Sequence, residues 1–391
     1  MKKKLIISLI CVVIGFLTFL LIFQEEIIPA ELHEHLEYIF NDFVDGDDLI
    51  YNAIVLVKDA DNNLVWQGSK VSIDYSQEED NNIDTPFFIA SITKLFTATL
   101  IMQLYEEGII DLDNSIADYL PEEIYSQINV YKGVDYSNKI SVRHLLSHSS
   151  GIADYYTGKP NKSKGLFNQF LKNPSQKWTV DDTIEWTKNE LSANNQPGKS
   201  HLYSDTNYQL LGKIIENVLQ KDLGSAYQQY IFYPLGLHNT YLIQDISFNE
   251  RKPVADIFHY EQNVSNLRYN GSYRADGGIV STANDCITFL HALRTGRLIS
   301  NDTLSLMQQW EKLSFPIQYG FGIMLFKLPN IINYFTDIPE LWGHSGSSGS
   351  FLYYSEDLNL YIAGTINQSS SNIKPFLLMG EILRTIKNKS S

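Results

Sequence analysis

The chain has 391 residues, of which 44% are hydrophobic, 13% aromatic and 19% charged, and this balance excludes a disordered protein. The formal net charge is -15, which argues against a nucleic-acid partner because phosphate binding requires neutralising cations. The two cysteines, Cys11 and Cys286, are too few for a disulfide framework or a cysteine-based zinc site.

An apolar run follows the first residues of the chain. Three lysines at positions 2–4 precede residues 5–23, which carry no charge. At about 1.5 Å per helical residue, this run matches the roughly 30 Å hydrocarbon core of a bilayer. No good small-x-small cleavage site follows it, which favours a membrane anchor over residues 1–23 and leaves a cleaved signal peptide as the alternative. Because the lysines stay inside, we expect a single-pass protein of the cell membrane with its body outside the cytoplasm, or a secreted protein if the run is cleaved.

The elements beyond this run predict an α+β fold. Helical spacing of apolar residues predicts a juxtamembrane helix within residues 24–45, and alternation predicts a hairpin over 51–58 and 64–68. Further helices are predicted over 91–107, 141–147, 205–219 and 284–295, and a second hairpin over 342–354 and 358–367 precedes a helix over 375–387. Strands near both ends and helices between them indicate one antiparallel sheet made from both termini, flanked by helices, with an inserted helical subdomain.

No internal repeat or low-complexity linker divides the body of the chain. Residues 46–391 are therefore interpreted as one domain. Its sheet part is expected at about 46–105 and 275–391, and its helical part at about 106–274.

The helix over 91–107 opens with Ser91-Ile92-Thr93-Lys94. Residues three apart lie on one helical face, so the Lys94 amine can reach the Ser91 hydroxyl. Burial and the helix dipole disfavour an ammonium at a helix N-terminus, which predicts a neutral Lys94 that accepts the proton of Ser91. A second Ser-x-x-Lys match, from Ser371 to Lys374, lacks the apolar helix behind its serine and is interpreted as a loop and helix start.

Other motifs do not indicate a metal or a cofactor. His144 and His148 are four residues apart, but no third ligand is near, so no metal site is predicted. Residues 193–200 fit a relaxed phosphate-loop spacing, but no buried strand precedes them and Pro197 stiffens them. We therefore expect neither a metal nor a nucleotide cofactor.

Two further segments follow Ser91 and Lys94 in a recognisable order. They are Tyr203-Ser204-Asp205 and His344-Ser345-Gly346, with the separation typical of serine penicillin-recognising enzymes. Matching phrases are also found at 108–113, 140–151, 197–198, 234–237, 275–278 and 319–322. Over roughly residues 45–370 the chain therefore resembles the serine β-lactamase-like family, in particular the group of class C β-lactamases, D-alanyl-D-alanine carboxypeptidases and esterases.

The resemblance implies a role for each matching catalytic residue. Ser91 would be the acylated nucleophile and Lys94 its base. Tyr203 would pass a proton to the leaving group and activate the water that deacylates the enzyme. The backbone N–H groups of Ser91 and Ser347 would form the oxyanion hole.

The resemblance also implies a substrate-binding strand, with two departures from the usual pattern. Ser345, Gly346 and Ser347 would line the cleft, and His344 would stand where many relatives have a lysine that holds a substrate carboxylate. A neutral imidazole attracts a carboxylate less than an ammonium does. Asp205 replaces the usual asparagine, which removes an amide donor, and its alternative role is a helix N-cap.

These residues together predict an extracytoplasmic serine hydrolase that works through an acyl-enzyme. Its expected substrates are small molecules or peptides, most of all D-alanyl peptides or related amides and esters of the cell wall. One alternative is a β-lactamase, which Asp205 and His344 disfavour because both weaken carboxylate binding. The other is a weakly catalytic penicillin-binding sensor or interaction protein, which the intact set of Ser91, Lys94 and Tyr203 disfavours.

Overall fold

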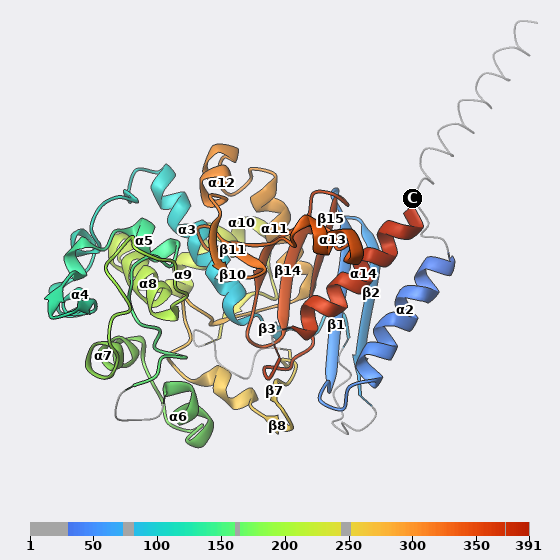
Figure 1. Cartoon of the computed structure of the whole chain (residues 1–391), viewed down its shortest axis with the longest axis horizontal. Coiled ribbons are helices and arrows are strands. Elements are labelled where there is room, and N and C mark those ends of the chain that lie inside the picture. The colour runs from blue at the N-terminus through green and yellow to red at the C-terminus, as the bar shows by residue number, and fades with distance from the viewer. Residues whose placement is uncertain (1–29, 73–81, 161–164, 244–251, 372, 391) are drawn as a thin grey trace, which may run out of the picture.

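A central antiparallel sheet joins the beginning of the domain to its end. The computed structural model describes residues 30–72, 82–160, 165–243, 252–371 and 373–390. Within them the sheet has eight strands in the order β10-β11-β12-β13-β14-β15-β1-β2 (Figure 1). The strands are β1 (Asn52–Asp59), β2 (Leu64–Val71), β10 (Glu311–Ser314), β11 (Ile317–Tyr319), β12 (Met324–Phe326), β13 (Leu341–Ser345), β14 (Ser350–Ser355) and β15 (Leu360–Thr365). Because β1 pairs with β15, the sheet is built from both ends of the chain, as the sequence predicts.

The second predicted hairpin contains one strand more than expected. The stretch 342–354 was expected as a single arm, but it forms β13 and β14. A turn separates them, in which the Gly346 N–H donates to the Ser350 carbonyl and the Gly349 N–H donates to the Gly346 carbonyl. Gly349 has a φ of 85°, a backbone region that favours glycine. Apolar residues lie on both sides of this turn, so the sequence pattern is that of one continuous strand.

Both faces of the sheet are covered. Ile54 and Leu56 of β1 belong to one apolar cluster, and Val55 and Val57 belong to another, because successive strand residues point to opposite faces. Helix α11 (Ala283–Arg294) lies on the first face, and α2 (Ala30–Asp45) and α14 (Lys374–Ser390) lie on the second (Figure 1). The remaining helices are α3 (Thr93–Glu106), α4 (Glu122–Tyr125), α5 (Val142–Leu146), α6 (Leu166–Lys172), α7 (Val180–Glu190), α8 (Asp205–Leu219), α9 (Leu223–Tyr227), α10 (Tyr233–Leu235), α12 (Asn301–Met307) and α13 (Asn330–Thr336).

Helix α2, which lies within the predicted juxtamembrane range 24–45, packs on the sheet layer. Leu36 and Phe40 are buried in the same apolar cluster as α14, and the Phe40 ring lies edge-on to Trp66 of β2 with centroids 5.7 Å apart. The expected boundary at residue 46 therefore divides one packed layer. The spacing of the apolar residues indicates the helix but not what covers it.

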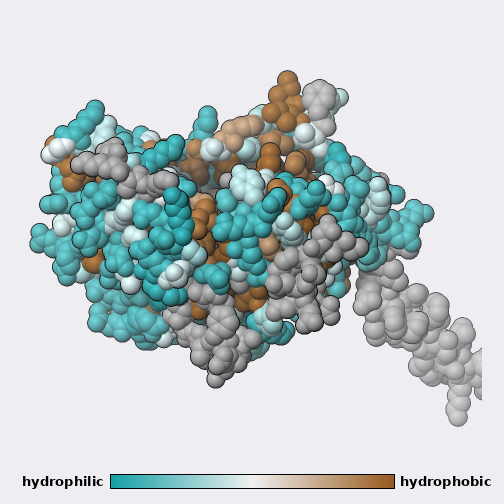
Figure 2. All heavy atoms as spheres, turned by 90° about the horizontal axis from the view of Figure 1, so that it is seen from below, coloured by the Kyte–Doolittle hydropathy of each residue, from teal (hydrophilic) through white to brown (hydrophobic). Residues whose placement is uncertain are grey.

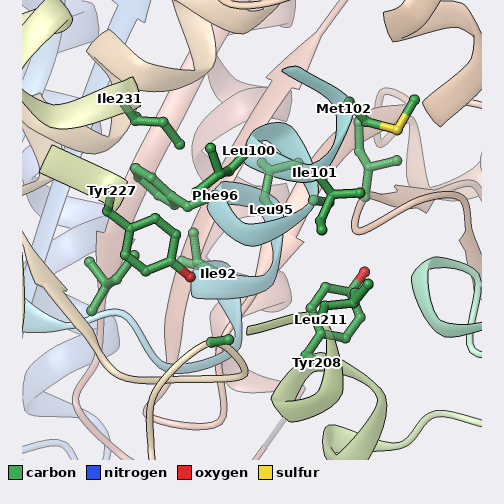
Figure 3. Packing of buried hydrophobic residues seen from close by; sticks show 14 of the residues in the cluster. Ile92, Leu95, Phe96, Leu100, Ile101, Met102, Tyr208, Leu211, Tyr227 and Ile231 are labelled. Atoms are coloured by element: carbon green, nitrogen blue, oxygen red, sulfur yellow. The ribbon is translucent and has the colours of Figure 1, made fainter. Parts of the chain in front are cut away.

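The helical part packs around α3. Figure 3 shows Phe96, Leu100 and Ile101 of α3 among side chains from α8 and from the segment after α9. The Phe96 ring also stacks on Phe289 of α11, with centroids 3.7 Å apart. A small sheet has the strand order β3 (Phe87–Phe88), β9 (Ile279–Ser281) and β6 (Tyr241–Leu242), and its strand β3 comes just before α3 in the chain. Two separate hairpins are formed by β4 (Val130–Tyr131) with β5 (Val134–Asp135) and by β7 (Phe258–His259) with β8 (Gln262–Asn263). Packing from both sides therefore fixes the beginning of α3.

The predicted anchor over residues 1–23 lies outside the described residues. Across residues 30–390, apart from the gaps given above, no helix has the length and apolar character needed to cross a membrane.

Figure 2 shows one face of the molecule, on which brown hydrophobic residues are visible through the middle, between teal hydrophilic residues.

Candidate active site

Ser91 and Lys94 are brought together at the entrance to α3. Ser91 lies in a single 3-10 turn, η1 (Ala90–Ile92), which runs directly into the helix, and Lys94 Nζ donates a hydrogen bond to Ser91 Oγ over 3.1 Å. Ala90 has a φ of 46°, which is uncommon for a residue with a side chain. This sharp turn leaves Ser91 partly exposed while Lys94 is fully buried.

Two more oxygen atoms lie close to the buried Lys94 ammonium. Nζ donates to the Asp276 backbone carbonyl over 2.6 Å and lies 2.5 Å from Oδ1 of Asp205. Burial lowers the pKa of Lys94, but the Asp205 carboxylate, together with Tyr203 and Asp276, outweighs burial and raises this pKa above its usual value. Lys94 is therefore a protonated ammonium in this structure, and the expectation of a neutral amine is corrected because it considered burial without the aspartate partner.

Tyr203 lies beside the same ammonium. Lys94 Nζ is 5.0 Å from the centre of its ring. Burial raises the pKa of Tyr203 to about 12, against the opposing effect of Lys94, so the residue is a phenol at neutral pH. His148 supports the ring from behind, with centroids 4.3 Å apart. His148 Nδ1 accepts from the Ser204 N–H and faces the Asn207 amide nitrogen at 3.1 Å, which fixes the ring next to the tyrosine.

Asp205 begins α8, and its carboxylate is directed at Lys94. Ser204, not Asp205, is the N-cap residue, so the alternative role of Asp205 as a helix cap is not observed. Two more carboxyl groups lie nearby. Asp154 accepts from the Asp205 N–H over 2.9 Å, and Asp276 accepts from the Tyr155 hydroxyl over 2.6 Å. Burial, followed by the charge of Asp205, raises the pKa of Asp154 to about 6 and that of Asp276 to about 7.

The predicted substrate-binding strand reaches the site only in part. His344 is fully buried on β13 and is not among the residues that line the cavity at Ser91. Its Nδ1 donates to the Ser345 carbonyl over 2.7 Å, and its Nε2 accepts from the Tyr319 hydroxyl over 3.1 Å. Burial, and then the Lys94 charge, lower the pKa of His344 to about 3. Both ring nitrogens are used inside the protein.

The turn after β13 packs directly against the Ser91 turn. A Cβ added to Gly346 would lie 2.4 Å from the Ile89 carbonyl oxygen and 3.1 Å from the Ala90 side chain, so glycine permits this close approach. Ser350 Oγ donates to the Ile89 carbonyl over 2.8 Å and fixes the contact. Ser345 Oγ instead pairs with the Tyr353 hydroxyl at 2.7 Å.

A cavity opens beside Ser91 with about 570 Å³ of space, including its open mouth. Of the predicted site residues, Ser91, Asp205 and Ser347 line it, and Asp276 and Gly277 lie next to them. Its other lining residues, mostly apolar or aromatic, are Phe88, Ala90, Tyr156, Phe167, Ile257, Val264, Leu267, Tyr273, Ser348 and Ser369. Sequence reasoning missed this wall, because its members come from separate segments with no shared local pattern.

The oxyanion hole predicted from Ser91 and Ser347 is compatible with this arrangement. Ser91 is the second residue of a helical turn, so its N–H is among those a helix start leaves without an intrahelical partner. Ser347 lines the same cavity. Within the described residues, no group of three histidine, cysteine or acidic side chains could hold a metal ion.

The chain is similar to several known proteins. A family model described as Beta-lactamase matches residues 46–376. Monacolin J acid methylbutanoyltransferase of Aspergillus terreus is 29% identical over 66% of this chain and 67% of its own length. Penicillin-binding protein 4* of Bacillus subtilis is 26% identical over 76% and 64%. The chain thus spans about two thirds of the length of these relatives. A D-stereospecific amidohydrolase from Streptomyces sp. superimposes with a TM-score of 0.71 at 29% identity, covering 89% of this chain and 97% of its own.

Proposed function

Because the chain belongs to the Beta-lactamase family and is a serine hydrolase of that family, we propose that it cleaves D-alanyl peptides, or related amides and esters of the cell wall, through an acyl-enzyme on Ser91. The observation that carries this proposal is the 3.1 Å contact between Ser91 Oγ and Lys94 Nζ at the edge of a cavity. Likeness to a D-stereospecific amidohydrolase supports substrates of D configuration.

Acylation requires that the buried ammonium first lose a proton. Lys94 Nζ then takes the proton of Ser91 Oγ as that oxygen bonds to the substrate carbonyl carbon. The charge that develops on the carbonyl oxygen is met by the N–H groups of Ser91 and Ser347. Tyr203 is a phenol, so it can give its proton to the leaving nitrogen or oxygen as that bond breaks, and Lys94 returns a proton to Tyr203.

Deacylation follows the same proton path with water in place of Ser91. Water attacks the acyl carbon and its proton passes through Tyr203 to the Lys94 amine, and Lys94 then gives a proton to Ser91 Oγ as the acyl–oxygen bond breaks. The described residues supply every proton transfer, and no metal or cofactor takes part in this scheme.

Covalent labelling tests the proposal. A fluorescent penicillin or a fluorophosphonate should label the wild-type chain and should not label Ser91→Ala, because the Ser91 hydroxyl is hydrogen-bonded to the buried lysine. Ser371→Ala is the matched control, since it removes the serine of the second Ser-x-x-Lys match, and it should be labelled like the wild type. Equal labelling of Ser91→Ala would refute the assignment of the nucleophile.

The location of the enzyme is part of the proposal. The three lysines at 2–4 and the uncharged run 5–23 support a membrane anchor with the catalytic domain outside the cytoplasm. Expressed in a bacterium, the full chain should fractionate with membranes, keep its N-terminal residues and lose its body to externally added protease. A soluble product that begins near Ala30 would show instead that the run is a signal peptide.

The cavity disfavours the β-lactamase alternative. A β-lactam carries a carboxylate beside its reactive ring, but no lysine, arginine or histidine is found among the described residues that line the cavity. We expect slow turnover of nitrocefin relative to p-nitrophenyl butyrate and a D-alanyl-D-alanine peptide. Nitrocefin hydrolysis far above the other two would make the enzyme a β-lactamase.

A further inference from the structure

We propose that the preferred substrates carry a free ammonium group on the carbon next to the scissile carbonyl, bound by Asp205, and an apolar side chain the size of leucine or larger, held in the cavity. This inference rests on the proposed function and narrows it: among the amides and esters proposed above, it favours those with a free amine and a large apolar side chain over N-acylated D-alanyl peptides.

One carboxylate oxygen of Asp205, Oδ2, is available to accept a hydrogen bond from a ligand. Its Oδ1 is paired with Lys94 Nζ at 2.5 Å, and that ammonium is also bonded to Ser91 Oγ and to the Asp276 carbonyl. No described residue donates a hydrogen bond to the second oxygen, Oδ2. The Asp205 side chain is 12% exposed and lines the cavity, so a ligand in the cavity can reach it.

The charges around the cavity favour a cation. Asp154, Asp205 and Asp276 bring three carboxyl groups together, and Lys94 is the one buried cation among them in the part of the chain that the structure describes. Burial, and after it the negative charge of Asp205, raises the pKa of Asp154 and of Asp276. A substrate ammonium supplies a second cation where burial makes a charge-assisted hydrogen bond strong.

The distances suit an α-amino acyl group. Lys94 Nζ lies 2.5 Å from Asp205 Oδ1 and 3.1 Å from Ser91 Oγ. The distance between Oδ1 and Oγ is therefore at most the sum of these two contacts. In an amino-acid amide or ester, the amine nitrogen is two bonds from the carbonyl carbon. When that carbon lies at attack distance from Oγ, about 3 Å, the ammonium falls within reach of Asp205. An N-acylated substrate presents an uncharged amide at the same place.

The cavity wall fits an apolar side chain. Phe167 of α6 packs on Tyr156 with ring centroids 5.0 Å apart, and Phe88 lies edge-on to Tyr273 at 6.0 Å. Ile257 and Val264 complete the apolar surface. These rings therefore pack against one another along the cavity wall. A methyl side chain reaches little of this apolar wall, whereas a leucine or phenylalanine side chain can bury apolar surface against it.

The test compares three amides and two variants at one neutral pH. The substrates are D-phenylalaninamide, N-acetyl-D-phenylalaninamide and D-alaninamide. In the wild type, kcat/KM for the free amine should exceed that for the acetylated compound by about tenfold or more, the scale of a charge-assisted hydrogen bond. It should also exceed kcat/KM for D-alaninamide.

The two variants separate the two halves of the proposal. Asp205→Asn should bring the ratio of amine to acetylated substrate toward one and leave the ratio of phenylalanine to alanine substrate unchanged. Phe167→Ala should lower the second ratio and leave the first unchanged. Because each readout is a ratio within one variant, a general change in catalytic rate cancels.

Each contrary outcome is informative. A wild-type preference for the acetylated amide, or a ratio that Asp205→Asn does not move, overturns the ammonium site. Equal rates for the alanine and phenylalanine amides overturn the apolar pocket. If no amide is cleaved although a fluorophosphonate labels Ser91, this inference fails and the proposed function stands. If Ser91 is not labelled, the proposed function itself fails.

Discussion

At the scale of single residues, Asp205 controls the charge of Lys94. Burial alone lowers the pKa of that lysine, and the carboxylate 2.5 Å away reverses the effect. We predict that Asp205→Asn lowers this pKa, because desolvation then acts with less opposition. Lys94 acts as a base only after losing a proton, so acylation of the wild type by an uncharged ester should increase with pH into the alkaline range. In Asp205→Asn the increase should begin at lower pH. Stopped-flow acylation by p-nitrophenyl butyrate across pH 6–10 measures the shift.

The control for this shift is a carboxylate far from the site. Asp113 pairs with Arg143 over 2.7 Å on an exposed part of the helical region. Asp113→Asn should leave the pH profile of acylation as in the wild type. A profile that is the same in Asp205→Asn and the wild type would show that Lys94 does not supply the titrating base.

The spacing of residues alone predicts only the local part of this site, whereas the predictions for Tyr203, Asp205 and Ser347 came from the family resemblance. Ser91 and Lys94 are three residues apart in one helical turn, so their spacing predicts their contact. The partners of Lys94 at Asp205 and Asp276 come from distant segments, and no local pattern relates them to the lysine. The charge state of Lys94 depends on those partners, which is why the neutral lysine was wrong. The phrase at 275–278 already signalled Asp276 as part of a shared motif, but without a role.

At the scale of elements, α2 contributes to the core of the domain. Leu36 is fully buried between the sheet and α14, whereas Tyr38, two positions later, is 65% exposed. We predict that Leu36→Ala lowers the free energy of unfolding by about 2–5 kcal/mol, the usual cost of a cavity in a core. Tyr38→Ala on the same helix is the matched control and should change it by less than about 0.5 kcal/mol. Urea unfolding of both variants gives the comparison, and equal effects would contradict the packing of α2 on the sheet.

The elements found from the sequence are those with a strong, long pattern. The hairpin of β1 and β2 and the helices α3, α8 and α11 agree with their predicted ranges to within a few residues. Strands β10, β11 and β12 were missed because each has only three or four residues, too few for an alternating pattern to stand out. They join the sheet through backbone pairing with one another and with β13, which sequence periodicity does not report.

At the scale of the whole molecule, two pairs of buried titratable groups have opposite effects on how the free energy of unfolding changes with pH. Asp154 and Asp276 have raised pKa values in the folded state, so their contribution is present in acid and is lost as the pH rises from about 4 toward 6 and 7. His148 and His344 have lowered pKa values, so the unfolded chain binds protons that the folded chain does not. Their contribution is present above about pH 6.5 and is lost as the pH falls. The two pairs therefore oppose each other between about pH 4 and 6.5.

Removing one of the two buried histidines should reveal its contribution. In His344→Gln the contribution of His344 is lost, and the contribution of Asp154 and Asp276, which stabilises the fold in acid, remains. Relative to the variant, the wild type should lose at most about 1.4 kcal/mol of unfolding free energy for each pH unit below about 6.5, because one proton is bound on unfolding. Urea unfolding at pH 4.5, 5.5, 6.5 and 7.5 measures the difference between the two proteins, and its slope is informative even if the variant is less stable throughout. A flat difference for His344→Gln would mean that His344 binds its proton equally in the folded and unfolded chains, contrary to its burial between Tyr319 and the Ser345 carbonyl.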